Sequence, residues 1–209
     1  MNEKKLILIL SVIFLVCVGG MAYLIAQMPQ FSEDAAAPVP VKASSTVGGP
    51  FSLTDQNGTP VTEANYADRY KLMFFGFTHC PGICPGELQK ISQILDILHE
   101  NGEKDAKIVP LFITIDPERD DVAAMKDYVA LFDPRIIGLT GTKDQIEAVK
   151  SAYKVYASKV ENPMMGDGNY MMDHSTFTYL MSPANELLLV FDMKDKPADV
   201  AAEIDGALP

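Results

Sequence analysis

Two cysteines in the segment CPGICP (residues 80–85) are the residues of this chain best suited to chemistry. An apolar run, residues 72–77, precedes the segment and a helix-like pattern follows it, so both thiols lie at a strand-to-helix junction. A helix N-terminus carries partial positive charge and unpaired N–H groups, which favour the thiolate, the form that binds metal or attacks a disulfide. Because Cys80 and Cys84 each precede a proline, which disfavours the α conformation, we expect both in a looped turn and not on one helical face.

A structural disulfide is the competing interpretation of this pair. Such a bond would close a very short loop, and closing a short loop removes little entropy from the unfolded chain. We therefore expect Cys80 and Cys84 to be functional, in either metal binding or thiol-disulfide exchange, and not to form a structural disulfide.

The elements that must position this segment follow from the hydrophobic pattern. The predicted strands cover residues 51–54, 70–77, 108–115, 135–139, 175–181 and 187–191. The predicted helices run from the cysteine segment to about residue 101, then to about residue 132, and over residues 143–153 and 198–208. A polar segment, residues 158–173, separates the last helix-strand unit from the final two strands. This order predicts an α/β domain with a mixed central sheet and helices on both faces.

The N-terminal part of the chain has the pattern of a membrane anchor. Residues 6–26 are apolar and uncharged, and Lys4 and Lys5 precede them, which predicts a membrane-spanning helix with residues 1–5 in the cytoplasm. Everything after residue 26 is then expected in an oxidising compartment. A cleaved signal peptide is the alternative, although the end of the run lacks the small-residue pattern of a cleavage site.

Composition separates a linker from a globular part. Residues 27–48 are rich in Pro, Ala and Ser without an amphipathic period, which predicts a flexible linker, and residues 49–209 are expected to form one domain. The net charge of −11 argues against nucleic acid as a partner.

The chain resembles a known family in three separate motifs. These motifs are GFTHCPGICP (residues 76–85), IDPERD (115–120) and YMMDHS (170–175), and they are similar to those of the Sco/SenC/PrrC proteins. The resemblance runs from about residue 49 to the C-terminus and implies a membrane-tethered thioredoxin-like fold. Gly82 departs from the acidic residue expected between the cysteines, which leaves every expected ligand in place.

The resemblance implies that Cys80, Cys84 and His174 bind one copper ion. Two soft sulfurs suit Cu(I), and an imidazole suits both Cu(I) and Cu(II), with zinc as a chemically compatible alternative. Asp173 is expected to orient the imidazole of His174 by accepting a hydrogen bond from the ring.

The remaining candidate ligands are expected to play lesser parts. His79 is expected to support the site, because consecutive side chains at a strand end point in opposite directions, and His99 is expected in solvent. Met164, Met165, Met171 and Met172 could contact Cu(I) transiently but are expected mainly to pack.

By the same resemblance, the expected function is that of a metallochaperone that delivers copper to the dinuclear copper centre (CuA) of cytochrome c oxidase during assembly. The expected partners are the oxidase subunit that holds this centre, an upstream periplasmic copper donor and a thioredoxin-like reductant. The expected location is a bacterial inner membrane, spanned once, with the domain in the periplasm.

Three other functions are compatible with the sequence. The main alternative is a thiol-disulfide oxidoreductase that reduces the copper-ligand cysteines of the oxidase subunit, with Cys80 and Cys84 as the catalytic pair and no need for His174. A thioredoxin-fold peroxidase would need an arginine-centred pocket that the sequence does not identify. A copper sensor would bind copper without passing it on.

Overall fold

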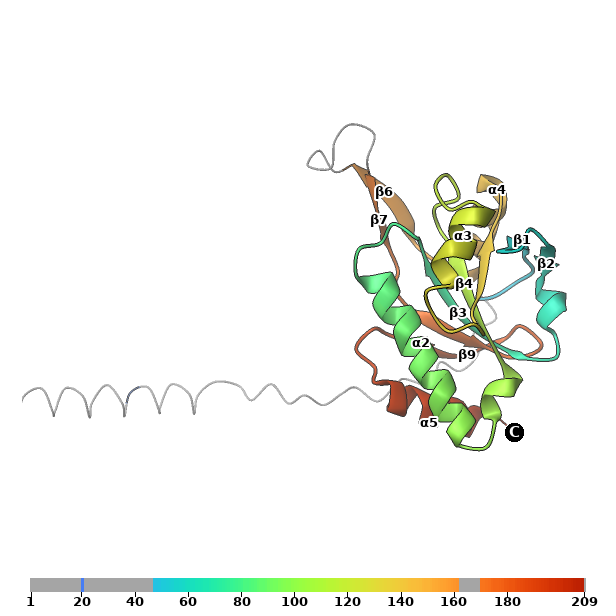
Figure 1. Cartoon of the computed structure of the whole chain (residues 1–209), viewed down its shortest axis with the longest axis vertical. Helices are drawn as coiled ribbons and strands as arrows, with labels where there is room; N and C mark the ends of the chain where they lie inside the picture. The colour runs from blue at the N-terminus through green and yellow to red at the C-terminus, as the bar shows by residue number, and fades with distance from the viewer. Residues whose placement is uncertain (1–19, 21–46, 162–169, 209) are drawn as a thin grey trace, which may run out of the picture. The chain divides into compact units, whose positions relative to one another are not determined.

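The computed structural model describes Gly20, residues 47–161 and residues 170–208 (Figure 1). Apart from Gly20, the predicted anchor at residues 6–26 lies outside the described residues, as do most of the predicted linker, Met164 and Met165. None of the helices in the described part of the chain has the length and apolar character needed to cross a membrane.

Nine strands, four α-helices and two short 3₁₀ helices make up the described chain. The strands are β1 (Ser52–Asp55), β2 (Pro60–Thr62), β3 (Tyr70–Gly76), β4 (Ile108–Thr114), β5 (Ile137–Thr140), β6 (Ala157–Glu161), β7 (Tyr170–His174), β8 (Thr178–Met181) and β9 (Leu187–Phe191). The α-helices are α2 (Ile83–Glu100), α3 (Val122–Val129), α4 (Lys143–Tyr153) and α5 (Pro197–Ala207), and the 3₁₀ helices are Glu63–Tyr66 and Lys104–Lys107.

Seven of these strands form one mixed sheet. Their order is β2-β1-β5-β4-β3-β8-β9, with β3, β4 and β5 parallel to one another and every other neighbouring pair antiparallel. The strands β6 and β7 pair only with each other among the described elements, as an antiparallel sheet of their own. The mixed α/β sheet predicted from the sequence is confirmed.

Alternate residues of the central strand β3 pack against helices on opposite faces of the sheet. Phe74 stacks on Phe112 with ring centroids 6.1 Å apart, and Phe112 in turn contacts Tyr128 of α3. Phe75 points the other way and meets Tyr153 of α4 at 5.7 Å. Because both faces are covered, β3 is an almost unbroken apolar run, as expected of a central parallel strand.

The first helix begins earlier than the prolines suggested. Gly82 is the N-cap of α2 and Cys84 is its second residue, so the prediction that both cysteines lie in a looped turn holds for Cys80 and is wrong for Cys84. The reason is that Pro85 falls in the first helical turn, where the missing N–H would have had no intrahelical partner. The preference against helix before a proline is therefore overridden at this position.

The strands β2, β6 and β7 and the two 3₁₀ helices were not predicted. The strand β2 has only three residues, and the polar segment at residues 158–173 contributes to the hairpin of β6 and β7. The side chains of β6 are half-buried or exposed, so this strand lacks the alternation of buried and polar residues that identifies a strand in a sequence.

Candidate metal and thiol site

The two cysteines touch at the junction between β3 and α2. Cys80 lies in the turn after β3, and its Sγ accepts a hydrogen bond of 3.3 Å from the backbone N–H of Cys84. Both are free cysteines, Cys84 fully buried and Cys80 with 9% of its surface exposed. A helix that begins at Ile83 thus directs its first N–H groups at the sulfur of Cys80.

This arrangement makes the two sulfurs chemically different. The pKa of Cys80 is lowered to about 5, mainly by a hydrogen bond from the Cys84 thiol and further by backbone N–H groups of the loop and helix start, against the opposing effect of burial. The pKa of Cys84 is raised, because its thiol donates that same hydrogen bond and because burial disfavours its charge. At neutral pH, Cys80 is therefore a thiolate and Cys84 a thiol.

Alkylation of the reduced protein should report this difference. We expect iodoacetamide to modify Cys80 and not Cys84 at pH 7, with a rate that rises through a midpoint near pH 5, because the lowered pKa keeps Cys80 ionised above that value. The measurement is the rate against pH, with the modified residue located by mass spectrometry and Cys80→Ser as the control. A midpoint near the ordinary thiol value would contradict the assignment.

A cavity lies between the turn that carries Cys80 (residues 77–82, the cysteine turn) and strand β7 of the β6–β7 hairpin. It has a volume of about 280 Å³, with residues 80–83 on one side and residues 171–174 on the other, and Phe77 and Thr176 completing its lining. Cys80 and His174, which the sequence places far apart, therefore face the same space. Cys84 does not line the cavity.

His174 is the last residue of β7, at the edge of this cavity. Its ring stands edge-on to Phe77, with centroids 5.8 Å apart and an interplanar angle of 83°. Its Nδ1 lies 2.8 Å from the carbonyl oxygen of Ser175, which suits an Nδ1–H donor and leaves the lone pair on Nε2 for a ligand. The orienting contact thus comes from a backbone carbonyl, whereas Asp173 is exposed and its orienting role stays a prediction.

The predicted ligand set is only partly brought together. The cysteines are in contact, and His174 shares a cavity with Cys80, but residues 47–161 and 170–208 contain no group of three or more Cys, His, Asp or Glu side chains arranged to hold a metal ion. The donor types still fit copper, because thiolates and an imidazole are soft and borderline ligands. The three-ligand set therefore stays a prediction.

The other candidates divide between the site and the surface. His79 does not line the cavity, and its Nδ1 is 3.0 Å from Thr78 Oγ1 and 3.8 Å from Asp120 Oδ1. His99 is exposed and pairs with Asp105. Met171 and Met172 line the cavity and pack partly against the core.

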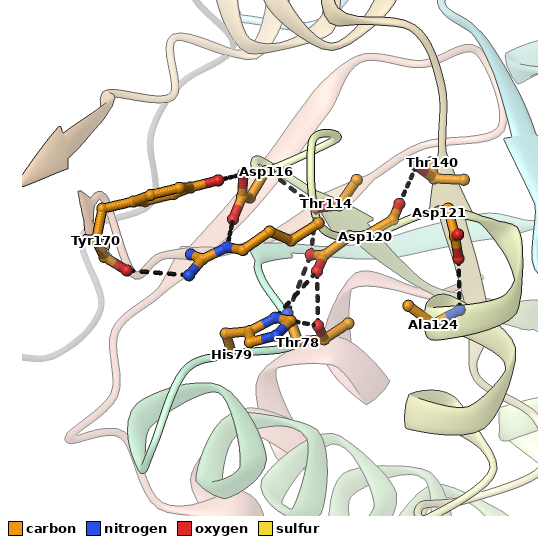
Figure 2. Close-up of polar contacts among 10 residues, drawn as sticks. Thr78, His79, Thr114, Asp116, Asp120, Asp121, Ala124, Thr140 and Tyr170 are labelled. Atoms are coloured by element: carbon orange, nitrogen blue, oxygen red, sulfur yellow. Dashed lines mark hydrogen bonds and ion pairs between the residues drawn. The ribbon is translucent and has the colours of Figure 1, made fainter. Parts of the chain in front are cut away.

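Sequence reasoning missed the structural part played by the turn between β4 and α3, residues 115–121. The sequence identified this segment only through the motif IDPERD, and in the structure the next residue, Asp121, caps α3 by accepting a hydrogen bond from the N–H of Ala124. The same turn also carries the buried acids Asp116 and Asp120, whose partners lie far along the chain (Figure 2). The signal available in the sequence was the charged motif IDPERD, one of the three motifs that carry the family resemblance.

Comparison with known proteins decides the family. The model of the SCO1/SenC family matches residues 40–208. The chain belongs to the SCO1/SenC family. The resemblance inferred from the three motifs is thereby confirmed.

Relatives of the SCO1/SenC domain include proteins with copper bound. The mitochondrial SCO1 homologue of Mus musculus is 44% identical over 76% of this chain and 55% of its own length. Solved structures of ScoI with copper bound from Arabidopsis thaliana and Bradyrhizobium japonicum are 40% and 42% identical, with TM-scores of 0.71 and 0.70. They cover 76% and 78% of this chain, and 95% and 99% of their own chains. The chain spans about half the length of the mitochondrial relatives.

Proposed function

We propose that the SCO1/SenC domain binds one copper ion through Cys80, Cys84 and His174 and delivers it to the CuA centre of cytochrome c oxidase during assembly. The observation that carries the proposal is the shared cavity, which a thiolate and an imidazole with a free Nε2 both face. The copper bound to two relatives at least 40% identical supports it.

The chain's own residues supply the steps of copper uptake and release. Cys80 offers a thiolate at neutral pH, whereas Cys84 must give up its proton, so uptake releases a proton and tightens as the pH rises. His174 adds an imidazole from a separate strand. Because the cavity opens to solvent beside the cysteine turn, a ligand of the acceptor can reach the copper before the donor ligands leave.

A thiol-disulfide reductase is the second candidate, and the split between the two cysteine pKa values favours it. The Cys80 thiolate would attack a target disulfide and displace one target thiolate, which takes up a proton. Cys84 would then give up its proton, attack the mixed disulfide and release the second target thiol. The products are a dithiol target and a Cys80–Cys84 disulfide, which a thioredoxin-like reductant must reduce again.

Substitution of His174 separates the two functions. In a strain that lacks the native copy, grown with limiting copper, we expect His174→Ala to keep its fold and its dithiol–disulfide cycle but to fail in assembly of the oxidase copper centre. The measurement is oxidase activity with the copper content of the purified oxidase. His99→Ala is the matched control, because His99 is exposed and pairs with Asp105 outside the cavity. Full oxidase activity with His174→Ala and none with Cys80→Ser would favour the reductase.

The site is further proposed to work at a membrane. The apolar run at residues 6–26, with Lys4 and Lys5 before it, supports a single-pass anchor in a bacterial inner membrane with the domain in the periplasm. Residues 27–48 would then be the tether that lets the domain reach an upstream copper donor and the oxidase subunit in turn.

A further inference from the structure

The turn between β4 and α3 holds two buried carboxylates, one bonded to Thr78 before the cysteines and the other to Tyr170 at the start of β7. Asp116 is 1% exposed and Asp120 is fully buried. Thr114 connects them, because its Oγ1 donates to Asp120 Oδ2 at 2.6 Å and accepts from the backbone N–H of Asp116 at 2.9 Å. Figure 2 shows these groups on one turn, between Thr78 on one side and Tyr170 on the other.

Asp120 holds the start of the cysteine turn. Its Oδ2 accepts a hydrogen bond of 3.0 Å from the backbone N–H of Thr78, and its Oδ1 accepts one of 2.6 Å from Thr78 Oγ1. Thr78 lies two residues before Cys80, whose N–H in turn bonds to the carbonyl of Phe77. A buried carboxylate with this many donors is costly to disturb, so the point at which the chain leaves β3 is well defined.

Asp116 and Arg119 hold the start of β7. Asp116 Oδ1 accepts a hydrogen bond of 2.6 Å from the hydroxyl of Tyr170, and Asp116 Oδ2 accepts one of 2.6 Å from Arg119 Nε. Arg119 Nη1 donates to the carbonyl of Tyr170 at 3.0 Å, and the guanidinium carbon lies 3.7 Å from the centre of the Tyr170 ring. One arginine-carboxylate pair therefore contacts the backbone, the ring and the hydroxyl of the same residue.

Tyr170, which Asp116 and Arg119 contact, and His174 are the first and last residues of one strand. β7 runs from Tyr170 to His174, and because side chains alternate along a strand, both lie on the same face. No strand of the central sheet pairs with β6 or β7 in the described chain, so contacts made by side chains help to set the position of this hairpin. Lys159 of β6 adds to them, since its ammonium lies 4.4 Å from the Tyr170 ring centre and pairs with Glu118 of the turn.

We propose that this turn sets the position of His174 relative to Cys80, with Asp116, Arg119 and Tyr170 as positioning residues for the imidazole and Asp120 and Thr78 for the thiolate. The inference rests on the proposed function, in which Cys80 and His174 bind one copper ion. The geometry that it concerns already exists in the metal-free protein. Misplacing one ligand by loss of such a contact lowers metal affinity, typically about 10- to 100-fold.

Tyr170→Phe tests the positioning of the His174 imidazole, because it removes the hydroxyl that bonds to Asp116 and keeps the ring that packs on Arg119. In the reduced full-length protein we expect the Cu(I) dissociation constant, measured by competition with a chromophoric chelator, to rise about 10- to 100-fold. In the metal-free protein, the NMR signals of the His174 ring should move, since that ring packs edge-on to Phe77. The Cys80 alkylation rate should stay unchanged. Tyr156→Phe is the matched control, because its hydroxyl bonds to Ser158 within the same hairpin region and not to the turn.

Thr78→Val tests the positioning of the Cys80 thiolate and should affect Cys80 while leaving His174 unchanged. It removes the 2.6 Å hydrogen bond to Asp120 and keeps the shape of the side chain. We expect a changed Cys80 alkylation rate with His174 ring signals like those of the native protein.

The outcomes separate the inference from the proposed function. Native His174 signals in Tyr170→Phe, or equal changes of both sites in both variants, would overturn the positioning role. If the native protein and His174→Ala bind copper equally well, the proposed ligand set fails, and the signals of the metal-free protein still decide the positioning role.

Discussion

Cys80→Ser is expected to abolish tight copper binding by the reduced protein. The substitution replaces the one side chain that is already a thiolate at neutral pH with a hydroxyl, which is a poor ligand for a soft metal. Cys84→Ser should have nearly the same effect, since it replaces the second proposed sulfur ligand with a hydroxyl. The measurement is copper stoichiometry after equilibrium dialysis against a competing chelator.

Two controls make this result specific. Cys17→Ser removes the third cysteine, which lies in the predicted anchor, and should leave one copper per protein. The native protein oxidised to the Cys80–Cys84 disulfide should bind no copper, because ligation requires free thiolates. A native stoichiometry in Cys80→Ser with unchanged affinity would remove these cysteines from the proposed site.

Gly76→Ala is expected to destabilise the fold and disturb Cys84 together. A Cβ atom at Gly76 would lie 2.8 Å from Cys84 Sγ, 2.9 Å from Phe112 Cε2 and 3.2 Å from Phe74 Cε1, all fully buried. Inserting a methyl group into so tight a space typically costs about 1–3 kcal/mol of unfolding free energy. The measurement is urea unfolding, with copper affinity in parallel because the sulfur must shift.

Gly86→Ala is the matched control and should have the opposite effect on stability. A Cβ atom at Gly86 meets nothing within 4 Å, and the residue lies inside α2. Replacing a helical glycine by alanine in open space should raise the unfolding free energy by about 0.5–1 kcal/mol. A Gly76→Ala protein as stable as Gly86→Ala would contradict the packing described around Cys84.

The parts of the fold with a strong hydrophobic period were predictable. The helix at residues 143–153 matches α4 at both ends, and the strand expected at residues 70–77 differs from β3 by one residue. These segments are buried along a full face or on both faces, so the spacing of their apolar residues predicts which element they form. The cysteine motif also placed the thiols at the correct junction.

The hairpin of β6 and β7 and the role of the β4–α3 turn were not predictable in the same way. Residues 157–161 are half-buried or exposed, so the pairing that makes β6 a strand leaves no periodic signal. Asp116 finds its partner hydroxyl on Tyr170 and Asp120 finds its donors on Thr78, and both pairings depend on tertiary folding. A sequence pattern reports only on residues that are near one another along the chain. The contacts of Asp116 and Asp120 form only after the chain has folded, with β4 beside β3.

The isolation of the β6–β7 hairpin from the central sheet has a consequence for how copper could be released. Opening a unit that shares no backbone ladder with the core leaves the central sheet intact and breaks the contacts that hold the hairpin to the β4–α3 turn, and such sub-global openings cost less than global unfolding. His174 is therefore carried by a unit that does not pair with the central sheet, whereas Cys80 and Cys84 are buried next to β3. If His174 binds copper as proposed, sequence changes in the hairpin can alter how often this ligand leaves the metal while the global stability stays constant.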